Sequence, residues 1–223
     1  MSEDNEVVKE VEEGPREHWP PVRLPFRFDD KRDLHEAVRR YVHTKGIDCP
    51  LGPIGTWDVS NISNMSQLFC GCSTFNESLE NWDVSHVVNM SSMFYGCYTF
   101  NQPLANWDVS NVVNMEGMFQ GCHTFNQPLA DWDVSCVEST YCMFDQCHSF
   151  NQPLADWNVS NVTSMYGMFC RCPSFNHSLF PWTQKNTHPH VMNAIQIDRI
   201  FLNTNQTVRC FKEPESYDDF LLK

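Results

Sequence analysis

Acidic side chains recur in this sequence at a fixed interval that would place them in one row. Asp58, Asp83, Asp108 and Asp133 follow one another at intervals of 25 residues, and Asn158 holds the next position of the series. A row of carboxylates can bind calcium or the basic surface of a protein partner. Calcium sites need about six to eight oxygen ligands and usually a glycine-rich turn, which this sequence lacks. We therefore expect no metal or other cofactor, and a partner-binding surface formed by Asp83, Asp108, Asp133 and Asn158.

Cysteine is abundant, but its spacing is typical of packing rather than of metal binding. Five of the eleven cysteines recur with the same period, namely Cys72, Cys97, Cys122, Cys147 and Cys172. Cysteines at equivalent positions of a repeat form an interior column, where they behave as small apolar side chains. Structural zinc sites combine two C-x2–4-C motifs, whereas the closest pairs here are C-x-C, beginning at Cys70 and Cys170. We expect reduced thiols, and disulfides between neighbouring repeats are the alternative.

No pattern of a catalytic site accompanies these residues. The sequence contains no glycine-rich phosphate loop, no nucleophile elbow and no H-E-x-x-H motif. Its nine histidines do not stand at ligand spacing from paired cysteines. We therefore predict that the protein is not an enzyme, and an unrecognised Cys–His enzyme is the remaining catalytic alternative.

The interval of 25 residues belongs to a repeat that extends through most of the chain. Five complete repeats span residues 57–181, and a sixth begins at Trp182. Each complete repeat opens with a tryptophan, and these are Trp57, Trp82, Trp107, Trp132 and Trp157. A period between about 20 and 50 residues indicates a solenoid, in which each rung buries its apolar face against its neighbours.

Within a repeat, the order of apolar residues predicts one short strand and about one helical turn. Leucine, tryptophan and valine follow the spacing L-x-x-W-x-V, which matches the strand segment of a leucine-rich repeat. The M-x-x-M-F segment that follows has the spacing of a helical turn. We therefore predict an α/β repeat fold, a right-handed, leucine-rich-repeat-like solenoid whose rungs each add one strand to a parallel sheet.

An asparagine follows the second phenylalanine of every repeat. The five residues are Asn76, Asn101, Asn126, Asn151 and Asn176. Stacked amides at a tight corner can satisfy backbone groups that the turn leaves unpaired, which is the role that we expect. A row of amides that binds a ligand is the alternative.

Residues 30–44 are predicted to form a helix in an N-terminal cap. Asp29 or Asp30 can cap its first turn, and Leu34 and Val38 fall on one apolar face. The first rung of a solenoid exposes an apolar cross-section unless another element covers it. We expect this helix to be that cover.

Composition and repeat phase divide the chain into five segments. They are a disordered acidic arm (1–20), an N-terminal cap (21–56), the repeats (57–181), a C-terminal cap (182–211) and an acidic tail (212–223). The arm lacks the apolar region of a signal peptide, and the chain has no apolar run of about 18 residues that could span a membrane. We therefore expect a cytoplasmic or virion-associated protein.

The net charge of −13 is concentrated in the repeats. Residues 57–181 contain eleven acidic residues and a single base, Arg171. A surface with almost no lysine or arginine cannot neutralise phosphates, which excludes nucleic acid as a partner of the repeats. A protein with a basic surface is the partner that this charge favours.

The fourth repeat departs from the pattern of the others. It has Thr140 where its neighbours have methionine, and cysteines at positions 136 and 142. We expect looser packing of that rung. Chance variation in a tolerant array is the preferred explanation, and a specialised surface is the alternative.

The repeat W-D-V-S-N-V-x-x-M-x-x-M-F-x-x-C-x-x-F-N-Q-P-L resembles that of the BspA-like leucine-rich-repeat surface proteins, over residues 57–182. The segment L-x-x-A-V before G-x-I-x-x-W is similar to the one that precedes the family's repeats. The resemblance implies a solenoid with protein-binding or adhesive roles and no catalytic residues. Unlike the surface members, this chain shows no signal peptide, lipobox or wall anchor.

These observations predict a non-catalytic, protein-binding repeat scaffold that presents an extended acidic face. Two alternatives stay open. The protein could be a structural component of a larger assembly, for example a virion, or a surface adhesin that is exported by a non-standard route.

Overall fold

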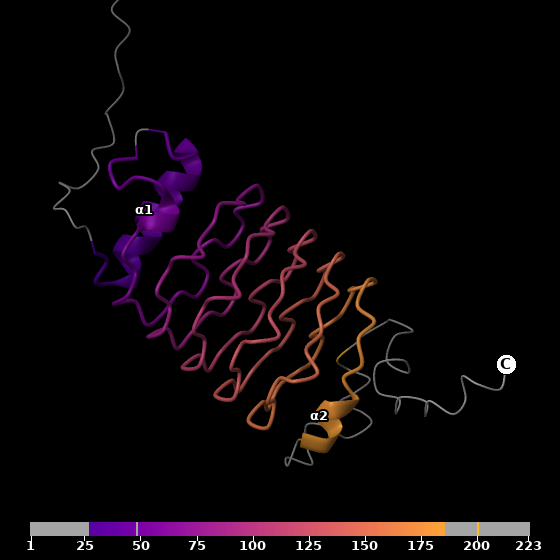
Figure 1. Cartoon of the computed structure of the whole chain (residues 1–223). Coiled ribbons are helices and arrows are strands. Elements are labelled where there is room, and N and C mark those ends of the chain that lie inside the picture. The colour runs from indigo at the N-terminus through magenta and orange to yellow at the C-terminus, as the bar shows by residue number, and fades with distance from the viewer. Residues whose placement is uncertain (1–26, 48, 186–199, 201–223) are drawn as a thin grey trace, which may run out of the picture.

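The structure is a computed structural model that describes residues 27–47, 49–185 and 200. Three helical elements are present in these residues: α1 (Lys31–Thr44), the short 3-10 helix η1 (Ile54–Thr56) and α2 (Phe180–Lys185). Figure 1 shows α1 at one end of a row of stacked coils and α2 at the other. The repeats therefore lie between two helical elements.

Helix α1 occupies the range in which the sequence predicted a helix, and it covers the first rung. The Asp30 side chain caps it by accepting a hydrogen bond from the backbone N–H of Asp33 at 2.9 Å. Its buried face includes Leu34 and Tyr41. The ring of Tyr41 lies 5.4 Å from that of Trp57, edge to face, so the helix packs directly on the first tryptophan of the repeats.

Backbone hydrogen bonds join each rung to the next in a fixed register. Between the first two rungs, the N–H groups of Met65, Gln67, Phe69 and Gly71 donate to carbonyls of the second rung at 2.7–2.9 Å. The equivalent four bonds recur at the next three interfaces, at 2.7–3.0 Å. The intervening N–H groups close turns within their own rung, as Leu68 does on Met65. The stack is therefore held together by main-chain bonds at every interface between rungs.

These bonds lie in a different part of the repeat from the predicted strand. The parallel bridges between rungs join Asn64, Asn89, Asn114, Ser139 and Ser164 in succession. This position follows the W-x-V segment, where the strand was expected. Between residues 57 and 179 the described chain forms turns and isolated bridges rather than a helical turn and a strand. The right-handed, leucine-rich-repeat-like class of the fold stays a prediction.

Two columns of stacked phenylalanine rings form the centre of the core. Neighbouring rings of the first column, which runs from Phe69 to Phe169, have centroids 5.4–5.7 Å apart. The second column, from Phe75 to Phe175, has spacings of 6.0–6.1 Å. Each ring of the first column is fully buried, so every rung contributes a similar apolar layer.

The tryptophan and cysteine ladders satisfy backbone carbonyls of the preceding rung, and the asparagine ladder satisfies backbone N–H groups of the following rung. The indole N–H of Trp107 donates to the carbonyl of Leu79 at 3.0 Å, and the Cys97 thiol donates to the carbonyl of Phe69 at 3.1 Å. The Asn76 side-chain oxygen accepts from the backbone N–H of Asn101 at 2.9 Å. The ten cysteines in the described part of the chain are free thiols. The ladders thus have a structural role in packing and turn closure.

The last repeat meets residues that come after it in the chain. Trp182 is buried, stacks on Trp157 and donates to the carbonyl of Leu154 at 2.8 Å. The backbone N–H of Phe169 donates to the carbonyl of Ile200 at 2.9 Å. The predicted arm (1–20) and tail (212–223), and most of the C-terminal cap (182–211), lie outside the described residues.

Each rung turns through two residues with a left-handed backbone. One of these columns contains Gly71, Gly96 and Gly121, followed by Gln146 and Arg171, whose φ angles are 63° and 55°. Side chains other than glycine cost free energy in this region, because Cβ approaches the backbone carbonyl. In this column, three rungs therefore have glycine, which suits the left-handed backbone, and two rungs have a strained residue.

Exchanging residues within this column should change stability in opposite directions. Gly121→Ala should destabilise the protein by at least about 1 kcal/mol, because the φ of 79° suits glycine. Gln146→Gly should stabilise it by up to about 1 kcal/mol, since the relief of strain exceeds the added chain entropy. Thermal unfolding monitored by circular dichroism tests both. Equal destabilisation by the two variants would contradict the role given to this column.

Candidate partner-binding surface

The predicted acidic column is exposed and is built into the turn that follows each tryptophan. One carboxylate oxygen of Asp83 accepts from the backbone N–H of Ser85 at 3.1 Å and from its hydroxyl at 2.6 Å. Asp108 accepts from Ser110 at the same two distances. The serine hydroxyl bond is the main cause that lowers the pKa of both carboxyl groups. The column therefore stays charged at neutral pH.

The same column ends in a residue that keeps the turn and loses the charge. Asp133 accepts from the backbone N–H of Ser135 at 3.0 Å, and the Asn158 side-chain oxygen accepts from that of Ser160 at 3.2 Å. All four candidate side chains are exposed and lie in consecutive rungs. The structure thus brings together the residues that the sequence proposed as a partner-binding surface, and it shows that each also closes a local turn.

Repulsion between neighbouring carboxylates is present but weaker than the hydrogen bonds to serine. The charge of Asp83 raises the pKa of Asp108, and that of Asp108 raises the pKa of Asp133, yet both values lie below the ordinary one.

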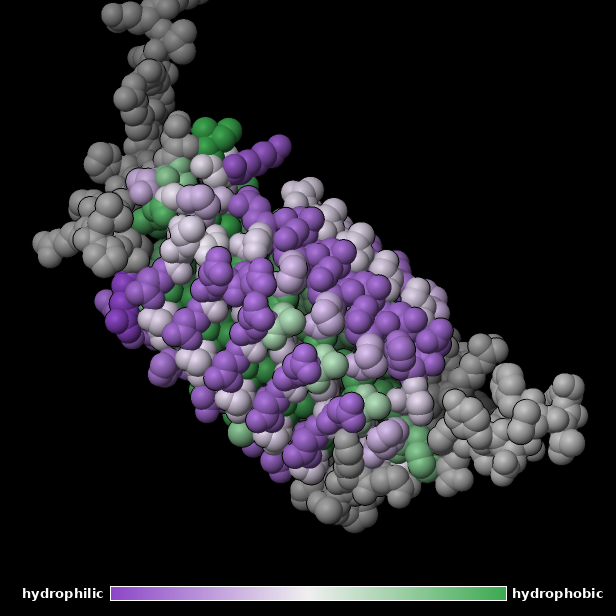
Figure 2. Space-filling model, viewed as in Figure 1, coloured by the Kyte–Doolittle hydropathy of each residue, from purple (hydrophilic) through white to green (hydrophobic). Residues whose placement is uncertain are grey.

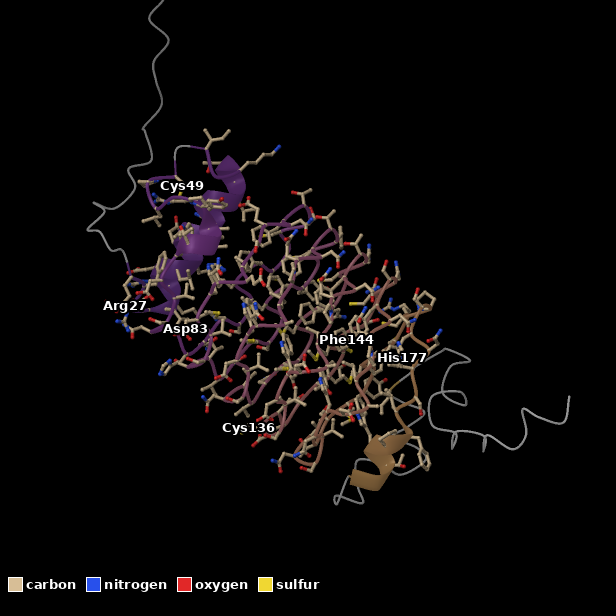
Figure 3. The ribbon with its side chains drawn as sticks, in the orientation of Figure 1. Arg27, Cys49, Asp83, Cys136, Phe144 and His177 are labelled. Carbon is tan, nitrogen blue, oxygen red and sulfur yellow. The ribbon has the colours of Figure 1, made fainter. Side chains whose placement is uncertain are left out.

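Figure 2 shows a mostly hydrophilic face with a row of weakly apolar side chains along the stack. Figure 3 shows Asp83 and Cys136 along one long edge of the stack.

The single base of the repeats is bound to a buried carboxylate that sequence reasoning missed. Asp145 is 2% exposed, and its two oxygens accept from the Nε and a terminal nitrogen of Arg171 at 3.0 and 2.8 Å. The Gln120 amide donates to the same carboxylate at 2.8 Å. Arg171 is therefore engaged in the fold and does not offset the charge of the acidic column.

Removing this arginine should destabilise the last two rungs. Arg171→Met should cost about 1–3 kcal/mol, because the buried carboxylate loses its charged partner. Adding Asp145→Asn should recover part of the loss, since no charge then stays buried. Arg39→Met is the control, because Arg39 is exposed in a surface ion pair with Glu36 and should matter by less than about 0.5 kcal/mol. Urea unfolding measures all three, and equal losses for both arginines would refute the assignment.

A second column at the surface consists of stacked planar side chains, of which Tyr98 and His148 are exposed and His123 is half-buried. The ring of His123 lies 4.8 Å from that of Tyr98 and 4.5 Å from that of His148, with both pairs nearly parallel. Burial, and then the charge of His148, lower the pKa of His123. The folded protein therefore binds a proton at His123 less readily than the unfolded chain does.

This lowered pKa predicts a loss of stability in mild acid. The contribution of His123 to the free energy of unfolding should be fully present above the ordinary histidine range. It should fall as the pH drops through about 6.5, where the unfolded chain begins to take up the proton. His123→Gln should reduce that dependence while leaving unfolding at pH 8 little changed. The measurement is the thermal unfolding midpoint as a function of pH, and an unaltered slope in the variant would count against the stacked pair.

Candidate metal and ligand sites were sought in the described residues. No group of three or more His, Cys, Asp or Glu side chains in them could hold a metal ion. An open hollow of about 490 Å³ lies between α1 and the first rung and is lined by polar groups. Its lining residues are Lys31, Arg32, His35, Glu36, Ser66 and Gln67. Ligand pockets are usually enclosed and mostly apolar, so this hollow does not resemble one.

Comparison with protein families gives a match that covers all five repeats. The family described as Mycoplasma protein of unknown function, DUF285, matches residues 39–147 and 106–207. The two matches together cover well over half of the chain. Neither the curated proteins nor the solved structures gave a match. No helix in the described part of the chain is long and apolar enough to cross a membrane.

Proposed function

Because the chain belongs to the family described as Mycoplasma protein of unknown function, DUF285, a BspA-like repeat family in general, we propose that it is a protein-binding repeat scaffold. In this proposal the 25-residue repeats form a right-handed, leucine-rich-repeat-like solenoid without catalytic activity. The exposed column of Asp83, Asp108, Asp133 and Asn158 contributes to the surface that meets the partner. The partner carries a basic surface.

The observation that carries this proposal is the imbalance of charge on the repeats. Eleven acidic residues stand against one base, and that base is paired with the buried Asp145. The acidic column is exposed and has a lowered pKa in each of its aspartates. Negative charge on a rigid, repeated surface attracts cations from solution and speeds association with a basic protein.

Individual contacts on such a surface are weak, so the proposal depends on their number. An exposed ion pair contributes about 0–1 kcal/mol and is screened by salt. Because consecutive rungs present equivalent carboxylates, a partner with similarly spaced bases can form several pairs at once. Affinity should therefore fall as salt is added, with a slope that reflects the number of pairs.

A structural role in a larger assembly is the second candidate function. It is supported by the ladders, because packing and turn closure use most of the repeated side chains and leave a rigid body. A cytoplasmic or virion-associated location remains part of the proposal, as does the alternative of an adhesin exported by a non-standard route. Crosslinking in the native source separates the roles, because a stoichiometric assembly favours structure and a transient partner favours recognition.

Neutralising the acidic column should weaken binding and leave the fold intact. The variant Asp83→Asn/Asp108→Asn/Asp133→Asn keeps the turn-closing oxygen, as Asn158 does in the fifth repeat. Binding to the partner identified by crosslinking should weaken about tenfold at low salt, which is about 1.4 kcal/mol. Isothermal titration calorimetry measures the affinity, and thermal unfolding checks the fold.

The matched control removes charge outside the column. Glu77→Gln/Glu80→Gln keeps the acceptors for Tyr41 and Asn106 and should change affinity much less. Unchanged binding by the triple variant, or an equal loss in the control, would exclude the acidic column as the binding surface.

A further inference from the structure

Another column changes from partly buried hydroxyls to an exposed carboxylate and exposed aromatic rings along the stack. Its members hold the same position in successive repeats and are Ser66, Ser91, Glu116, Tyr141 and Tyr166. The rings of Tyr141 and Tyr166 are stacked, with centroids 5.6 Å apart and an angle of 9° between their planes. They are 44% and 38% exposed. We call these two rings the tyrosine ladder.

The fold does not require rings at this position. The backbone N–H of Gly117 donates to the carbonyl of Tyr141 at 2.7 Å, and that of Ser92 donates to the carbonyl of Glu116 at the same distance. Serine, glutamate and tyrosine therefore occupy equivalent positions with the same bond between rungs. The phenylalanine columns supply the core, whereas the two tyrosines stack on each other at the surface and leave part of each ring in solvent.

Negative charge lies beside the tyrosine ladder. Glu116 is the preceding member of the column and accepts from the Ser139 hydroxyl at 2.8 Å. Arg171, the one base of the repeats, is paired with Asp145. The ladder is thus an exposed aromatic surface with a carboxylate and without a cation from the repeats.

We propose that the tyrosine ladder binds arginine side chains of a basic protein partner. A planar guanidinium can stack on a tyrosine ring while its N–H groups donate to Glu116, whereas a lysine ammonium lacks both the plane and the fork of donors. Tyrosine and arginine are also enriched where protein interfaces gain most of their affinity. The proposal rests on the proposed function, since it names the chemistry and the site by which the basic partner is recognised.

Two extended peptides of equal length and charge test the choice of cation. One carries arginines and the other lysines at the same positions, and each is labelled for fluorescence anisotropy with the full-length protein at low salt. The arginine peptide should bind several-fold more tightly. Tyr141→Ala/Tyr166→Ala should weaken it about five- to tenfold, as expected for two exposed cation–π contacts, and should weaken the lysine peptide by a clearly smaller factor.

The chain offers matched controls. Tyr141→Phe/Tyr166→Phe keeps both rings and should keep the preference for arginine. Tyr95→Ala removes a tyrosine of the same 44% exposure that has no stacked ring among the described residues, and it should have little effect. Circular dichroism and thermal unfolding verify that each variant is folded.

The outcomes separate this inference from the proposed function. If both peptides bind equally and only the triple aspartate variant weakens them, the acidic surface stands and the tyrosine ladder is refuted. If neither peptide binds, both proposals fail. Self-association that disappears in Tyr141→Ala/Tyr166→Ala would assign the arginines to a second copy of this chain and would overturn the proposal of a different partner.

Discussion

The pairing of backbone N–H groups between successive rungs fixes the register of the whole stack. From Met65 to Cys72, alternate N–H groups donate to the next rung and the intervening ones close turns within the rung. Nearly all donors of this segment are therefore satisfied by the main chain alone. Because the pairing repeats with the 25-residue period, each side chain lies beside its equivalent in the neighbouring rung. One inserted residue would displace all the columns beyond it.

The effect of this register depends on the chemistry of each column. Phenylalanine rings gain by stacking on their own kind and are buried, and the buried thiols from Cys97 to Cys172 each donate to a carbonyl of the preceding rung. The side-chain oxygen of an asparagine accepts a hydrogen bond from the backbone N–H of the asparagine in the next rung, as Asn76 does from Asn101. The asparagines of the column are therefore hydrogen-bonded to one another. Aspartates repel one another, and their column is tolerated because it is exposed and because a serine in the same turn binds each carboxylate. The same constraint that builds the core thus concentrates charge at the surface.

The side-chain columns could be predicted from the sequence because the period alone determines which residues are neighbours. The cap helix could be predicted as well, since Asp30 and the spacing of Leu34 and Val38 are local signals. The hydrogen bonds of the ladders could not be predicted from the sequence. The bond from the Trp107 indole to the carbonyl of Leu79, for example, depends on the path of the backbone between rungs.

Other features depend on a single residue in one rung. Burial of Asp145 was hidden because the equivalent positions hold cysteine, tyrosine and glutamine, and the lone Arg171 was the one available signal. In a repeat array, a residue type that recurs in every repeat indicates a requirement of the fold. A residue that occurs in only one or two repeats has to be interpreted from its own surroundings. Tyr141 and Tyr166 are such a case, because the register is the same whether serine, glutamate or tyrosine stands there. The two rings stack on each other and still leave a large part of their surface in water, and a partner that covers this surface is the physical reason that we propose for them.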